Sequence, residues 1–148
     1  MRLRLILTVW LAFSGNAAGQ SFQDSLQNEH IQANVPSEDV FSTFLDRDIL
    51  TYLQSEVSAD IAAVETALLR QGATQSGVAY PKFYLWVVAT SNDGTVLEGA
   101  ARAAAVDRIR FEVTDFLSAE EIGSDPQAVS SVFPASLVSD IMTRAMVK

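Results

Sequence analysis

Apolar residues recur every three or four positions between residues 37 and 70, which is the periodicity of an amphipathic helix. The apolar positions are Phe41, Phe44, Leu45, Ile49, Tyr52, Leu53, Val57, Ile61, Val64 and Leu68. Ser37 is a suitable N-cap, and Gly72 is well placed to end the helical region. The pattern predicts either one long helix over this stretch or two helices divided near Ser58.

A different pattern begins after Pro81, where aromatic and β-branched residues dominate about ten positions. The pair Asp93-Gly94 follows, and it is a strong turn signal because tight hairpins need a positive φ. We therefore predict an antiparallel pair of strands over residues 82–90 and 95 to about 101. Pro81 lacks a backbone N–H, so it belongs at the start of the first strand or on an edge.

The next stretch is ambiguous because its alanines favour a helix while its setting favours a strand. We favour a strand over residues 100–106, with a short helix as the alternative. Further on, polar and apolar residues alternate with the period of two that is typical of a half-buried strand. The polar positions of this third strand are Arg108, Arg110, Glu112 and Thr114, and the apolar positions are Ile109, Phe111 and Val113.

The C-terminal part returns to helical signals. Ser118 and Glu121 have the spacing of a capping box, and Asp125-Pro126 fits an N-cap followed by proline at the first helical position. Pro134 is suited to start a last helix. The order of elements predicts an α+β fold, in which N-terminal helical segments pack on an antiparallel β-meander of about three strands, with short C-terminal helices.

The first twenty residues have the three-part layout of a secretory signal peptide. Arg2 and Arg4 precede an apolar run, and small residues follow it. We expect residues 1–19 to be a cleavable signal peptide, residues 20–36 a flexible polar leader, and residues 37–148 a single α+β domain. An apolar run of this length is too short to span a bilayer, so we expect no stable membrane anchor after cleavage.

Composition narrows the destination and the partners. The chain has no cysteine, which leaves no site for a disulfide or a bacterial lipid anchor, and it has no Asn-x-Ser/Thr glycosylation acceptor. We therefore expect a periplasmic or secreted bacterial protein. The net charge is −8, and loss of Arg2 and Arg4 with the signal peptide would make it more negative. Because phosphate recognition depends on Lys and Arg, we expect no nucleic-acid partner.

The inventory of reactive side chains gives little support for catalysis. His30 is the only histidine and lies in the polar leader, where nothing would fix it as a general base. Asp46 and Asp48 are two residues apart on a predicted helix, so they should point in different directions. We predict no catalytic residue, no metal site and no cofactor.

The predicted sheet carries the strongest candidate binding residues. Alternation places Tyr84 and Trp86 on one face of their strand and Phe83 on the other, while Phe111 should point inward. The candidate set for a ligand or a protein partner is Tyr84, Trp86, Arg102, Arg108 and Arg110. Two other interpretations stay open at this point. The aromatic residues are core if helices cover both faces, and the arginines form ordinary ion pairs if they face solvent.

These observations favour a non-enzymatic binding or accessory protein that engages a protein partner or a small ligand through its sheet face. The alternative is a small carboxylate-dependent enzyme with a pocket between helix and sheet. A buried carboxylate in a cleft would favour the enzyme, and an open aromatic or basic face would favour the binding protein. A third possibility, a purely structural protein, would expose a large apolar patch.

Overall fold

The computed structural model describes residues 33–75 and 79–147. The predicted signal peptide and most of the predicted leader, including His30, lie outside these residues. Helix α2 (Glu38–Glu56) comes first, followed by four strands and then three helices. The strands are β1 (Ile61–Leu68), β2 (Lys82–Ser91), β3 (Val96–Asp107) and β4 (Arg110–Ser118), and the helices are α3 (Ala119–Ser124), α4 (Pro126–Val132) and α5 (Ala135–Met146). The α+β prediction is confirmed.

The strands form one antiparallel sheet in the order β1-β2-β3-β4. The prediction of about three strands missed β1, because residues 61–68 were assigned to a helix. They form a strand because they pair with β2 along their length, from Ile61 opposite Ser91 to Leu68 opposite Leu85. Residues 100–106 belong to β3, so the strand interpretation of the alanine stretch is confirmed. Gly94 has a φ of 84° in the β2–β3 turn, as the Asp-Gly signal predicted.

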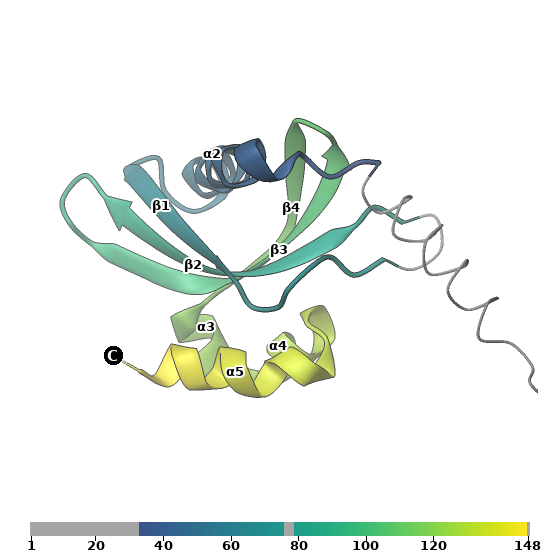
Figure 1. Cartoon of the computed structure of the whole chain (residues 1–148). Coiled ribbons are helices and arrows are strands. Elements are labelled where there is room, and N and C mark those ends of the chain that lie inside the picture. Colours follow the sequence, from purple (N-terminus) through teal and green to yellow (C-terminus); the bar gives the residue numbers. More distant parts are fainter. Residues whose placement is uncertain (1–32, 76–78, 148) are drawn as a thin grey trace, which may run out of the picture.

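Helix α2 covers the concave face of the curved sheet (Figure 1). Its buried residues Leu45, Ile49 and Leu53 pack against apolar side chains of the strands. Phe41 meets Phe83 and Phe111 edge to face, with ring centroids 5.0 and 5.1 Å apart. Three alanines of β3 face the same layer, namely Ala101, Ala103 and Ala105. Their small side chains leave room for the helix and the aromatic rings close to the strands.

Helices α3, α4 and α5 cover the convex face (Figure 1). Buried residues of this helical layer pack against Tyr84, Trp86 and Ala100 of the sheet. The buried residues of the layer are Ile122, Val129, Phe133, Leu137 and Ile141. The predicted start signals are confirmed here. Ser118 and Glu121 form a capping box, and the Asp125 side chain accepts hydrogen bonds from the first backbone N–H groups of α4. The sheet is therefore the middle of three layers.

Candidate binding site

Tyr84 and Trp86 lie in the core between the sheet and the C-terminal helices. Their exposed fractions are 5% and 6%, and the Tyr84 ring centroid is 6.1 Å from that of Phe133. The Tyr84 hydroxyl also shares a hydrogen bond of 2.9 Å with the Thr74 hydroxyl. These two residues therefore do not form an open aromatic face. Helices cover both faces of the sheet, which was the alternative that the sequence left open.

Arg102 lies on the same convex side and joins three elements. Its guanidinium forms an ion pair with Asp115 and donates hydrogen bonds to the Thr114 hydroxyl at 3.0 Å and to the Val132 carbonyl at 3.1 Å. These contacts tie β3 to β4 and to the end of α4. The guanidinium is thus used within the protein, as the ion-pair interpretation of the arginines supposed.

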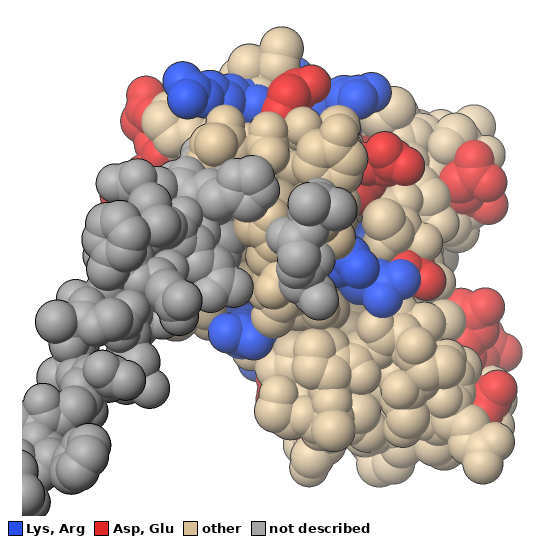
Figure 2. Space-filling model, turned by 90° about the vertical axis from the view of Figure 1, so that its right-hand side faces the viewer, with Lys and Arg blue, Asp and Glu red and all other residues tan. Residues whose placement is uncertain are grey.

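Arg108 and Arg110 lie at the far end of the hairpin from Arg102. The alternation of residues predicted that Arg108 and Arg110 share one face of a strand. Arg108 instead belongs to the turn between β3 and β4, so that prediction is wrong. The pairing places Arg102 opposite Asp115 and Arg110 opposite Asp107. Asp107 lies five residues beyond Arg102 on β3, so the two pairs are about 16 Å apart along the strand. Figure 2 shows basic side chains as separate groups with acidic side chains beside them. The predicted basic residues do not form one site.

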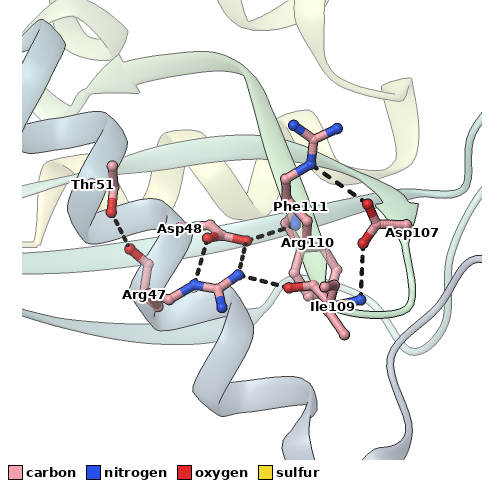
Figure 3. A network of polar contacts seen from close by, with 7 residues as sticks. All are labelled: Arg47, Asp48, Thr51, Asp107, Ile109, Arg110 and Phe111. Atoms are coloured by element: carbon pink, nitrogen blue, oxygen red, sulfur yellow. Dashed lines mark hydrogen bonds and ion pairs between the residues drawn. The ribbon is translucent and has the colours of Figure 1, made fainter.

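A polar network ties α2 to the β3–β4 hairpin (Figure 3). Arg47 donates to Asp48 at 2.8 Å and to the Ile109 carbonyl at 2.7 Å, and Asp48 accepts from the Phe111 N–H at 2.7 Å. The hydrogen bond that Arg47 donates to Asp48 raises the pKa of Arg47 above its ordinary value. Together the two side chains bind a carbonyl and an N–H at the start of β4. This network therefore holds the fold together.

Asp46, two residues before Asp48, points toward the opposite edge of the sheet. Its carboxylate accepts a hydrogen bond of 2.6 Å from the Thr66 hydroxyl of β1. Asp46 and Asp48 therefore serve different strands, as the two-residue spacing predicted.

A cavity of about 740 Å³ opens where the N-terminal end of α2 meets the sheet. The chain brings four separate segments to it, which are the start of α2, the end of β1 with the following loop, the start of β2, and the β3–β4 turn. The lining residues are Val35, Pro36, Ser37, Glu38, Phe41, Ser42, Leu68, Gly72, Phe83 and Arg108. Arg108 is thus the one predicted site residue that lines this cavity.

The walls of the cavity are mainly apolar, with a few polar groups at defined places. Phe41 and Phe83 belong to the edge-to-face aromatic cluster and are held by it. The Arg108 side chain is fixed by a hydrogen bond of 3.1 Å from its Nε to the Ala33 carbonyl. The serine hydroxyls and the Glu38 carboxylate come from the first turns of α2. Such a lining suits an apolar group that carries one or two polar atoms.

Sequence reasoning missed most of this site because its residues are far apart along the chain. No short motif connects Leu68 of β1 with Ser42 of α2 or Arg108 of the hairpin turn. The local signals that were present, such as the N-cap at Ser37, describe secondary structure and give no information about a cavity.

Other kinds of site have less support within residues 33–75 and 79–147. No group of three or more His, Asp or Glu side chains there is arranged to hold a metal ion, and no polar or charged residue there is fully buried. No helix in that part of the chain is long and apolar enough to cross a membrane. Comparisons with protein-family models, curated proteins and solved structures find no match.

Proposed function

We propose that this chain is an exported, non-enzymatic binding protein that works in the periplasm or outside the cell. The cavity at the N-terminal end of α2 is the proposed binding site. It takes either a small ligand or an apolar side chain of a protein partner. The observation that carries the proposal is its size and lining, since about 740 Å³ lies within the roughly 300–1,000 Å³ of typical small-molecule sites.

The polar groups of the cavity suggest what the ligand looks like. The Nε of Arg108 is held by the Ala33 carbonyl, and the terminal nitrogens of a guanidinium suit the two oxygens of a carboxylate or sulfonate. The aromatic wall of Phe41 and Phe83 favours an apolar body. A ligand with an apolar body and an acidic head matches both features.

This proposal replaces the sheet face with the cavity as the place of binding. The faces around Tyr84 and Trp86 are filled by the protein's own helices, so no binding role is proposed for these two residues. Arg102 and Arg110 likewise keep no proposed role, because each pairs with an acidic residue of the hairpin.

The enzyme alternative also involves a pocket between helix and sheet. An acid-base mechanism of the predicted kind needs a carboxylate whose environment fits it for proton transfer. Glu38 is the only carboxylate among the lining residues, and it is exposed in the first turn of α2. The lining supports binding better than acid-base chemistry.

The cavity is tested with 8-anilinonaphthalene-1-sulfonate, a probe with an apolar ring system, a sulfonate and a fluorescence that rises in apolar surroundings. We expect saturable binding to the folded protein. Ser42→Phe should fill the cavity and weaken binding by about tenfold or more, which corresponds to roughly 1.4 kcal/mol. Fluorescence titration at a temperature well below the melting transition gives the dissociation constants.

The matched control is Thr43→Phe, which adds the same ring to the neighbouring exposed position of α2 outside the cavity lining. Thr43→Phe should bind the probe as the unmodified protein does. Equal binding by Ser42→Phe and the unmodified protein would contradict the proposed site.

Export is tested by expressing the whole chain in a bacterium with its own N-terminus. We expect the mature protein in the periplasm or the medium, beginning near Gln20, because the first residues have the layout of a signal peptide. Intact-mass measurement of each cell fraction gives the start residue. A cytoplasmic protein that retains residues 1–19 would contradict the localisation.

A further inference from the structure

The outer edge of β1 offers backbone groups for pairing with another strand. The N–H of Leu69 donates to the Tyr84 carbonyl at 2.9 Å, so these two residues form a hydrogen-bonded pair between β1 and β2. In an antiparallel ladder such pairs alternate with pairs whose backbone groups point away from the partner strand. The outward-pointing residues of β1 are therefore Val64, Thr66 and Leu68. No hydrogen bond to their backbone groups occurs within residues 33–75 and 79–147.

The opposite edge of the sheet is blocked. The outward N–H of Phe111 in β4 is bound by the Asp48 carboxylate, and the nearby Ile109 carbonyl is bound by Arg47. Farther along β4, the pairing with β3 shifts near Thr114, which interrupts a regular edge. β1 differs, because its pairing with β2 is regular from Ala63 to Leu68. Natural sheets usually protect such an edge, because its free backbone groups can pair with another strand. An unprotected edge is therefore a candidate site for strand pairing.

The open edge leads directly to the proposed binding cavity. Leu68 is the last residue of β1, its backbone points outward, and its side chain lines the cavity. A strand added beside β1 from Val64 to Leu68 would cover about 13 Å at the usual rise per residue. Alternate side chains of that strand would lie on the α2 side of the sheet, where one of them reaches the cavity mouth.

The acidic residues around the β1 edge favour a basic partner. Glu65 is exposed in the middle of β1 on the side away from α2, and Glu56 and Asp60 precede the strand. The whole chain carries a net charge of −8. A basic side chain opposite Glu65 would form a favourable cross-strand pair. Pairing with β1 of a second copy, centred on Thr66, would instead bring two Glu65 side chains diagonally together, which is unfavourable.

We propose that β1 binds an extended, basic peptide segment of a protein partner as a fifth strand of the sheet, with one apolar side chain of that segment in the cavity. This inference deepens the proposed function and rests on it. Backbone hydrogen bonds supply the pairing, and the cavity and Glu65 supply the preference for alternating apolar and basic residues.

The probe is an acetylated and amidated heptapeptide in which lysine alternates with valine, phenylalanine and valine. Titration into the ¹⁵N-labelled protein should shift the backbone amide resonances of Val64, Thr66 and Leu68. A matched peptide with glutamate in place of lysine should bind about tenfold more weakly or worse, and Glu65→Lys should reverse this preference. A lysine peptide that binds no better than the glutamate peptide would contradict the charge argument.

The edge itself is tested with Thr66→Pro, which removes an outward N–H without removing a ladder hydrogen bond to β2. Thr66→Val is the matched control, because both variants lose the hydroxyl that donates to Asp46. The proline variant should bind the peptide about tenfold more weakly than the valine variant. Equal binding by the two variants would overturn the proposal.

A second test uses the unmodified protein and does not depend on how Thr66→Pro folds. Two versions of the peptide carry N-methyl groups, one on its lysines and the other on its apolar residues. Only one set of N–H groups faces β1 in a paired strand, so only one version should lose binding. Equal affinity of the two versions would overturn strand addition.

Failure of this inference is distinguishable from failure of the proposed function. If the naphthalene probe binds and the lysine peptide does not, strand addition is overturned while the cavity keeps its role. If neither binds, both proposals fall. A dimer that Thr66→Pro dissociates, seen by analytical ultracentrifugation, would overturn the peptide proposal in favour of pairing between two copies.

Discussion

The two faces of the sheet are covered by different kinds of layer. Among the residues that the structure describes, one helix of 19 residues, α2, covers the concave face, and it comes before the strands in the chain. The convex face has three helices that come after the strands, of 6, 7 and 12 residues. Isolated helices this short are marginal in water, so the convex layer depends on its caps and on packing. The stability of α2 depends on its packing too, but α2 is longer and therefore relies less on caps.

The two layers are also joined to the sheet by different polar contacts. On the concave side Asp46 and Asp48 fix α2 to the two outer strands, β1 and β4. On the convex side Arg102 reaches from the sheet to the last carbonyl of α4. Each layer thus has its own connection to the strands. Within residues 33–75 and 79–147, helices cover both faces of the sheet, so the binding that we propose uses an end and an edge of the sheet.

Because both faces are covered, we expect a buried aromatic residue on each face to contribute strongly to the free energy of unfolding. Trp86→Ala on the convex face and Phe111→Ala on the concave face should each lower the free energy of unfolding by about 3–5 kcal/mol, because both remove a large buried side chain. Urea denaturation followed by circular dichroism measures the loss for each variant.

The control for both variants is Tyr80→Ala, since the Tyr80 side chain is half exposed. Its effect should stay within about 0.5 kcal/mol. A loss of less than about 1 kcal/mol for Trp86→Ala, with a full loss for Phe111→Ala, would show that the convex layer contributes little to the fold.

A smaller effect is expected at Gly99, where β3 and β4 come close together. A Cβ atom there would collide with the carbonyl of Leu117 and the ring of Phe116. Gly99→Ala should therefore lower the free energy of unfolding by about 1–3 kcal/mol, as overpacking does. Gly123→Ala is the matched control, because nothing lies within 4 Å of its added Cβ and the residue is helical. The control should melt at the same temperature or higher.

Much of this layered fold was predictable because its signals are local. The Asp93-Gly94 turn, the capping box at Ser118 and the Asp125-Pro126 pair each specify a short segment. β1 was missed because Ile61, Val64 and Leu68 fit a helical repeat in a window of only eight residues. What makes this segment a strand is its pairing with β2, a long-range contact that local propensity does not contain.

The candidate site was less predictable than the fold. Alternation correctly separated Tyr84 and Trp86 from Phe83, but it could not say what covers each face. One signal was available, since β2 is apolar from Phe83 to Ala89 without a polar break, which is typical of strands buried on both faces. The cavity needs the positions of four segments in space. Only Arg108 was common to the prediction and the cavity lining.

The last and smallest effect concerns Tyr52, which lies on α2 and packs against the concave core. Burial, reinforced by the charge of Glu56, raises the pKa of its phenol above the ordinary value of 10.0. The folded protein therefore holds this proton more tightly than the unfolded chain. The stability linked to it is fully present below about pH 10 and is lost as the pH rises through the folded pKa. Tyr52→Phe removes this contribution. The melting temperature of the unmodified protein should thus fall more steeply than that of Tyr52→Phe above about pH 10, with a constant difference between them near pH 8. If the melting temperatures of the two proteins instead change in parallel with pH, the phenol is equally hydrated in the folded and unfolded states. The concave layer would then be less tightly packed at Tyr52 than its contacts indicate.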